Sequence, residues 1–379
     1  MEEWKTCKIS DISIMSNGRK RPSSVGAVPV YGGNGIMDYV SDFNQEDVIA
    51  VGRVGAYCGC VFLAKGKCWI SDNAISVKNT EETDLHYLYY LLKTLDLNHH
   101  HIGAAQPLMT QDVIGRIEVS IPTRRIQEQV AGILLSIDQK IELNNRINHN
   151  LEQQAQALYK SWFVDFEPFK GGKFVASELG LIPEGWEVKP LGTICQIEKQ
   201  TINPQKQPSC SFCHYSIPAY DNSEQPEIQK GSDILSNKFL IEDETILFSK
   251  LNPRIKRIWN VYKSEINSIC STEFVVYKSI VRELYPFVYS VITGDEFYNS
   301  IMSKVNGATG SHQRFHPEET LDFLVPYHDN TIRLFGNLVL PIIQQVAENK
   351  KENHNLVTLR DSLLPKLISG ELKINDLTC

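Results

Sequence analysis

Residues 125–163 read RIQEQVAGILLSIDQKIELNNRINHNLEQQAQALYKSWF, and this stretch decides the fold of the chain. It contains no proline, and its only glycine is Gly132. A helix of this length would be a rod about 60 Å long, whereas helices of globular proteins average about 11–12 residues. The stretch therefore predicts one unusually long helix.

Apolar residues recur along this helix at alternating steps of three and four, which is typical of a coiled coil rather than of a globular helix. Two asparagines interrupt the stripe, and polar residues at such positions cost stability but fix the register of paired helices. Such a helix needs a partner. The predicted stripe comprises Leu134, Ile137, Ile141, Asn144, Asn148, Leu151, Ala155, Leu158 and Trp162.

The predicted partner helix lies in the same chain, in NLVLPIIQQVAENKKENHNLVTLRDSLLPKLISGEL at residues 337–372. Each stripe position follows its counterpart by 205 residues, as Gln344 follows Gln139, and NHNL at 148–151 recurs at 353–356. Chance similarity of two amphipathic helices is the alternative, and the shared NHN in one heptad frame disfavours it. The second stripe comprises Val339, Ile342, Val346, Asn349, Asn353, Leu356, Arg360, Leu363 and Leu367. If the two seams face each other, leucine at both Asn148 and Asn353 should stabilise the pair but loosen its register.

The repeat extends beyond the helices, with an offset that grows from 182 residues (Trp4 to Trp186) to 205. A growing offset is expected for a duplicated unit whose second copy has gained loops. The aligned segments are 3–5 with 185–187, 47–49 with 244–246, SDNAISVK at 71–78 with STEFVVYK at 271–278, 103–104 with 307–308, and 117–122 with 321–326.

The 379-residue chain therefore divides into two globular α/β modules, each followed by a long helix, which is an α+β organisation. The predicted segments are a first module at 1–123, a central helix at 124–166, a linker at 167–183, a second module at 184–327 and a C-terminal helix at 328–370.

Within the modules, short apolar runs separated by glycine-bearing turns predict curled sheets of short strands. Strands are expected at 47–51, 60–64, 68–70, 74–77, 246–249 and 273–277, with a turn at 65–67. Helices are expected at 84–94, capped by Thr83, and at 284–305. Pro341 is expected to kink the second long helix or mark a second start, and Gly370 to end it.

Composition is that of an ordinary globular protein, with 42% hydrophobic and 22% charged residues. There is no apolar run long enough to span a membrane and no apolar core for a secretory signal at the N-terminus. Nine cysteines without a secretory signal then suggest reduced thiols in the cytoplasm. A net charge of −7 argues mildly against nucleic-acid binding.

No catalytic motif is present: the chain lacks a GxxxxGK[ST] phosphate loop, a GxGxxG after a strand and an HExxH. Cys210, Cys213 and His214 fit the letters of haem attachment, but a polar loop with two thiols is the simpler interpretation. The histidines at 99–101 are interpreted as a solvated run rather than a metal site. We therefore expect no catalytic residue, metal or cofactor in this chain.

Basic and amide side chains recur in two equivalent loops of both modules, around residues 53 and 106 and around 250–257 and 311–314. Such side chains hold phosphates and read base edges. A solvated surface explains any one loop more simply, but recurrence in both copies makes DNA binding an equally good interpretation. Acidic residues on the helices, such as Glu142 and Glu348, account for the net charge. The candidates are Arg19, Lys20, Arg21, Tyr31, Asn34, Arg53, Gln106, Lys250, Asn252, Arg254, Lys256, Arg257, His312, Gln313 and Arg314.

The chain resembles the DNA-specificity (S, or HsdS) subunit of type I restriction–modification systems over nearly its whole length. The two helix segments carry this resemblance most specifically. Supporting segments are WKTCKISDI, EGWEVKPLGTIC, VPVYGGNGIMDYV, VIAVGRVGAYCG, WISDNAISVK, the GAAQP loop and LRDSLLPKLISGEL.

The resemblance implies two target-recognition domains related by a pseudo-twofold axis and held apart by an antiparallel coiled-coil pair. Each domain would read one half of a bipartite DNA target. It also implies two methyltransferase (M) subunits docked on the helices and motor-nuclease (R) subunits, in a bacterial or archaeal cytoplasm. S-adenosylmethionine, ATP and Mg would be bound by those partners.

The two copies differ at equivalent positions, because Arg53 is replaced by Lys250 and Asn73 by Glu273, so we expect different half-sites. Two other classes of function remain open. One is a non-catalytic scaffold with two peptide-binding modules, which would show no salt-dependent DNA binding. The other is an enzyme acting alone on nucleic acid, which the missing motifs disfavour.

Overall fold

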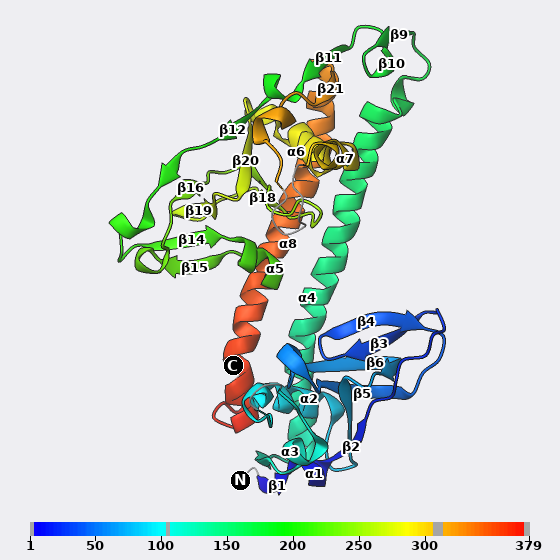
Figure 1. Cartoon of the computed structure of the whole chain (residues 1–379), viewed down its shortest axis with the longest axis vertical. Helices are drawn as coiled ribbons and strands as arrows, with labels where there is room; N and C mark the ends of the chain where they lie inside the picture. Colours follow the sequence, from blue (N-terminus) through cyan, green and yellow to red (C-terminus); the bar gives the residue numbers. More distant parts are fainter. Residues whose placement is uncertain (1–3, 104–106, 306–313, 375–379) are drawn as a thin grey trace. The chain divides into compact units, whose positions relative to one another are not determined.

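A computed structural model describes residues 4–103, 107–305 and 314–374 (Figure 1). The chain forms two compact units. The first unit comprises Met1–Glu142 and Asn355–Cys379, and the second comprises Leu143–His354. Two long helices, α4 (Arg124–Tyr159) and α8 (Asp329–Ser369), contribute residues to both units.

The first unit contains a six-stranded sheet in the order β2-β7-β5-β6-β3-β4, in which only the β3–β6 pair is parallel. Its strands are β2 (Ser13–Asn17), β3 (Val28–Gly32), β4 (Gly35–Val40), β5 (Gln45–Gly52), β6 (Val61–Ile70) and β7 (Ala74–Asn79). A separate antiparallel pair joins β1 (Lys5–Lys8) to β8 (Glu118–Ile121). The helices of this module are α1 (Ile9–Ile12), α2 (Leu85–Thr94) and α3 (Gln111–Gly115).

One hydrophobic core joins this sheet to the long helices, because Ile49 of β5, Leu88 of α2, Leu134 of α4 and Leu367 of α8 belong to the same buried cluster. All four side chains are almost fully excluded from solvent. The apolar side chains near the start of α4 are therefore buried against the first module as well as against α8.

Two local predictions for the first module are wrong. The expected turn at 65–67 lies inside β6. The neighbouring strand β5 bulges at Asp47, whose carboxylate accepts a hydrogen bond from the Gly66 amide of β6 at 2.7 Å. The cap of α2 is Asp84 rather than Thr83, since its carboxylate accepts from the amides of His86 and Tyr87. Thr83 instead is fully buried.

The second unit contains a four-stranded sheet, β12-β20-β17-β18, and a five-stranded sheet, β13-β16-β19-β14-β15. The four-stranded sheet comprises β12 (Cys195–Glu198), β17 (Thr245–Ser249), β18 (Ile258–Val261) and β20 (Phe274–Ser279). The five-stranded sheet comprises β13 (Thr201–Ile202), β14 (Ser211–Tyr215), β15 (Glu227–Lys230), β16 (Lys238–Leu240) and β19 (Ser268–Ser271). β11 (Glu187–Pro190) pairs with β21 (Leu324–Tyr327), and the linker forms a hairpin of β9 (Phe174–Ser177) and β10 (Gly180–Pro183).

The helices of the second module are α5 (Ile217–Ser223), α6 (Tyr285–Thr293) and α7 (Asp295–Ser303). The single helix expected at 284–305 is therefore wrong. Gly294 adopts an extended conformation, with φ −70° and ψ 157°, which ends α6 and starts α7. The break lets Phe297 of α7 turn back onto Phe248 of β17.

The two modules share a local plan, as the sequence alignment predicts. In the first, Gly52 of β5 pairs with Ala74 of β7, and in the second, Ser249 of β17 pairs with Phe274 of β20. The next residue along repeats the same backbone hydrogen bond. The Arg53 amide donates to the Asn73 carbonyl at 2.9 Å, and the Lys250 amide donates to the Glu273 carbonyl at 2.9 Å. The structure confirms this part of the alignment.

Within the second unit, α4 and α8 lie side by side and run antiparallel (Figure 1). Asn144 donates to Asn353 at 2.9 Å, whereas Asn349 donates to Asn148 at 2.7 Å, so numbering rises along one helix as it falls along the other. All four asparagines are buried. In the first unit, Arg360 of α8 bonds the carboxylate of Asp138 of α4 at 2.7 Å.

Two features mark the long helices. α8 is one continuous helix through Pro341, so of the two expected effects the second start does not occur, and Pro341 lies on the exposed side of the helix. α4 passes into a single π-helical turn, Lys160–Val164, which directs Phe163 into an aromatic core with Trp186, Phe287 and Phe335.

Candidate nucleic-acid interfaces

In the first unit, three loops meet at the end of β5. The Arg53 carbonyl accepts from the Met109 amide at 2.8 Å, and Val54 forms an antiparallel bridge with Leu108. The β3–β4 turn lies against the same place, because a Cβ added at Gly33 would stand 3.8 Å from the Val54 carbonyl oxygen. The exposed Asn34 follows in that turn. The two predicted loops, after β5 and around residue 106, and the β3–β4 turn therefore converge at Arg53. Gln106 itself lies outside the described residues.

The remaining candidates of the first unit separate into different environments. Arg19 and Lys20 are exposed, and Arg21 is paired with Asp38. Tyr31 is 9% exposed and packs in a core cluster with Cys68, so its assignment as a surface DNA contact is wrong. Burial there raises the pKa of the Tyr31 hydroxyl. β3 is covered on both faces at this point, because the neighbouring residues Val30 and Tyr31 face opposite sides of the strand and are both buried beside the parallel β6.

In the second unit, the equivalent place brings together Lys250, Glu273 and Arg314. The Glu273 carbonyl accepts from the Lys250 amide. Its carboxylate accepts two hydrogen bonds from Arg314, one from Nε at 3.2 Å and one from Nη2 at 3.1 Å. Arg314 and Lys250 are 64 positions apart in sequence, yet both contact Glu273. His312 and Gln313 lie outside the described residues.

Not all basic side chains of the loop at 250–257 are free to contact DNA. Arg257 is 7% exposed, and its guanidinium makes a bidentate pair with Asp221, at 2.6 and 2.9 Å. Lys256 is also engaged, since its ammonium donates to the Thr293 carbonyl at 2.9 Å. Arg254 is exposed and Asn252 half-buried. The assignment of Arg257 as a DNA contact is therefore wrong, because tertiary packing buries it against α5.

The Cys210–His214 segment is part of a sheet rather than a polar loop. Cys213 and His214 are buried in β14, and His214 Nδ1 lies 2.8 Å from the Gln229 amide oxygen on β15. Burial lowers the pKa of His214 and raises the pKa of the Cys213 thiol. Among the residues that the structure describes, no group of three or more His, Cys, Asp or Glu side chains could hold a metal ion.

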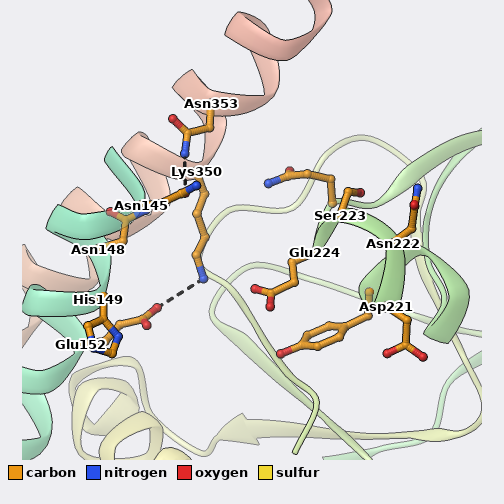
Figure 2. A pocket seen from close by; sticks show the side chains of 12 residues that line it. Asn145, Asn148, His149, Glu152, Asp221, Asn222, Ser223, Glu224, Lys350 and Asn353 are labelled. Carbon is orange, nitrogen blue, oxygen red and sulfur yellow. Dashed lines mark hydrogen bonds and ion pairs between the residues drawn. The ribbon is translucent and has the colours of Figure 1, made fainter. Parts of the chain in front are cut away.

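A polar pocket of about 450 Å³ opens where α4 and α8 meet α5 in the second unit (Figure 2). Glu152 and Lys350 form an ion pair at 3.3 Å on one wall, and Asn353 donates to Asn145 at 2.7 Å. The opposite wall is formed by residues 220–225. Sequence reasoning missed this wall, although Ser216 followed by a proline at position 218 is a helix-start signal, and the Ser216 hydroxyl does cap α5.

Comparison with known proteins shows what the chain is similar to. Residues 1–153 match the family model described as the type I restriction modification DNA specificity domain. The MjaIX specificity subunit of Methanocaldococcus jannaschii is 29% identical over 310 residues, covering 77% of this chain and 70% of that protein. The HindI specificity subunit of Haemophilus influenzae is 25% identical over 329 residues, covering 70% and 71% of the two chains.

The fold is also similar to that of a solved structure. The crystal structure of a type I restriction–modification S subunit from M. genitalium superimposes with a TM-score of 0.61 at 17% identity, covering 97% of this chain and 96% of that one. The chain is therefore similar, over its first 153 residues in sequence and over nearly all of its length in fold, to type I restriction–modification DNA-specificity subunits. Both of these relatives are named as specificity subunits of type I restriction enzymes. Of the helices among the described residues, none is long and apolar enough to cross a membrane.

Proposed function

We propose that the chain binds double-stranded DNA and selects a bipartite target, each module reading one half. The observation that carries this proposal is the repeated strand end, where one backbone hydrogen bond sets Arg53 in the first module and Lys250 in the second. Both residues lie where separate loops converge. Arginine and lysine contact guanine edges and phosphates. Because the neighbouring side chains differ, the two half-sites should differ as well.

The long helices are proposed to dock two methyltransferase subunits, with motor-nuclease subunits joining that assembly. Exposed apolar residues support this role, since Leu143 and Ile147 of α4 and Leu334 and Leu338 of α8 are between about a third and two thirds exposed. S-adenosylmethionine, ATP and Mg would be bound by the partners. Such an assembly acts on cellular DNA, so we expect the chain in the cytoplasm of a bacterium or archaeon.

The test measures DNA binding by the complex of this chain with the methyltransferase subunit of its own system. Duplexes with two randomised half-sites around a spacer are selected for binding, and the affinity of the selected target is measured at several salt concentrations. We expect preference at both half-sites and a log–log decrease of affinity with salt. Binding that is indifferent to both sequence and salt would favour the protein-interaction scaffold instead.

Single substitutions then test which half-site is contacted by Arg53 and which by Lys250. Arg53→Ala is expected to weaken binding and relax the preference in one half-site only, by about 5-fold to 150-fold if it reads a base. Lys250→Ala should act on the other half-site, or reduce the salt slope by about one if it holds a phosphate. Lys173→Ala removes an exposed positive charge from the linker hairpin and serves as the matched control. Identical effects of all three variants would contradict the assignment.

A further inference from the structure

Among the residues that the structure describes, the contact between Arg314 and Glu273 leaves one edge of the guanidinium without a hydrogen-bond partner. Glu273 accepts from Nε and Nη2, which form the side of the planar fork. Arginine has five N–H donors, so the two hydrogens of Nη1 and the second hydrogen of Nη2 are not taken by this carboxylate. The end of the fork can therefore still donate two parallel hydrogen bonds. Arg314 is about half-exposed, with 51% of its side chain open to solvent.

Both partners are held by the fold rather than by each other alone. Glu273 immediately precedes β20, its amide donates to the Ser271 hydroxyl at 3.3 Å, and its carbonyl bonds the Lys250 amide. Phe315, the residue after Arg314, is 4% exposed and packs edge-on against Phe248 of β17. The backbone on each side of the ion pair is thus anchored to the same sheet, which limits the orientations of the guanidinium.

An arginine held side-on by a carboxylate is suited to one base. Guanine presents O6 and N7 as two adjacent acceptors in the major groove, and two parallel N–H donors match them. A carboxylate that fixes the other edge lowers the entropy lost on contact. The negative charge of the carboxylate also offsets the positive charge of Arg314. The pair therefore contributes little to sequence-independent attraction of DNA phosphates.

We propose that Arg314 reads a guanine in the half-site of the second module, and that Glu273 is the positioning residue that presents its fork. This inference rests on the proposed DNA-binding function. The first module has Asn73 at the place of Glu273, and a neutral amide cannot form the same ion pair. The guanine contact is accordingly a property of the second half-site, and it distinguishes the two halves of the target.

The experiment uses the complex with the methyltransferase subunit and the selected bipartite duplex, with each half-site varied base by base. For the unsubstituted protein, we expect one position of one half-site to prefer guanine by about 5-fold to 150-fold over other bases. Arg314→Lys keeps the charge but removes the fork, and should abolish that preference while general affinity changes little. Arg314→Ala should abolish it and weaken binding.

Glu273→Gln separates positioning from a merely structural role. It keeps the shape of the side chain but removes the charge that orients Arg314, so guanine preference at the same position should fall about 3-fold to 10-fold. The salt dependence should become steeper, because Arg314 is then free to contact a phosphate. Lys173→Ala, which removes an exposed charge outside both recognition loops, is the control, and should leave the preference at this position unchanged.

The outcomes are separable. If the unsubstituted complex shows no sequence preference in either half, the proposed function fails and this inference with it. If the complex selects a bipartite target but Arg314→Lys and Glu273→Gln change no base preference, only the inference about Arg314 is overturned. Thermal melting of each variant checks that the fold is retained, and Arg314→Lys, at a half-exposed position, is the variant expected to keep it intact.

Discussion

At the scale of single residues, buried amides decide how α4 and α8 meet in the second unit. Asn148 accepts from Asn349, and Asn144 donates to Asn353. The predicted double substitution of Asn148 and Asn353 is therefore mismatched. It would remove one member of each pair and leave the amides of Asn144 and Asn349 buried without these partners. For that physical reason we now expect this double substitution to destabilise the helix pair rather than to stabilise it.

The matched pair is Asn148 with Asn349. Asn148→Leu alone should lower the free energy of unfolding by about 1–3 kcal/mol, because the Asn349 amide loses its acceptor in a buried site. Adding Asn349→Leu should recover most of this loss, since removing both partners leaves an apolar contact. Urea denaturation measures the three variants, with the exposed Asn150→Leu as control. The pairing would be contradicted if the double variant lost as much free energy of unfolding as the two single variants together, or more.

Arg257 provides a second prediction at this scale. Its guanidinium is buried and bonded twice to Asp221, so Arg257→Ala should lower the free energy of unfolding by about 1–3 kcal/mol. The figure lies below that of a fully buried pair because 48% of the Asp221 side chain is exposed. DNA affinity, measured well below the melting temperature, should remain unchanged. A normal melting curve with lost DNA binding would restore Arg257 as a contact.

At the scale of elements, α8 stays helical through a residue that ordinarily breaks or kinks helices. Pro341 lacks the amide hydrogen that would bond the carbonyl four residues earlier, and its ring crowds that carbonyl. The helix nonetheless continues because Val339 and Ile343, on the opposite side, are 0% and 2% exposed in the core of the second unit. Tertiary packing here outweighs local helix propensity.

Pro341→Ala is therefore expected to stabilise the chain. The substitution restores one backbone hydrogen bond and removes the ring, and it increases the entropy of the unfolded chain only modestly, so we expect a gain of about 1–2 kcal/mol. Chemical denaturation measures this gain, and an alanine at the exposed Glu348 of the same helix is the control. A loss of stability would show that the proline is required where it lies.

At the scale of the whole molecule, the chain is a duplicated module whose copies keep their framework and change their loops. The strand pairing at Gly52–Ala74 recurs at Ser249–Phe274, although none of these residues is identical between copies. The side chains around these strand ends, by contrast, differ in charge and size. A shared framework with divergent loops is how one fold can recognise two different ligands.

Much of this organisation follows from the sequence alone. Heptads and the repeated NHNL predict the long helices, because these patterns depend on periodicity within one segment. Short apolar runs predict strands β5, β6, β7, β17 and β20, whereas the other strands of the described residues were not predicted. The strand ends at Arg53 and Lys250 were found in the same way, from matching segments of the two copies.

Only the tertiary structure decided which candidate side chains remain exposed and able to contact DNA. The sequence shows that Arg257, Tyr31 and Arg314 are polar or basic, but not that Arg257 is buried against Asp221 or that Tyr31 lies in a core. Nor does it show that Glu273 holds Arg314 by one edge, because these partners lie 36 and 41 residues apart. Periodicity describes one segment at a time, whereas the burial and pairing of a charge depend on segments that meet only after folding.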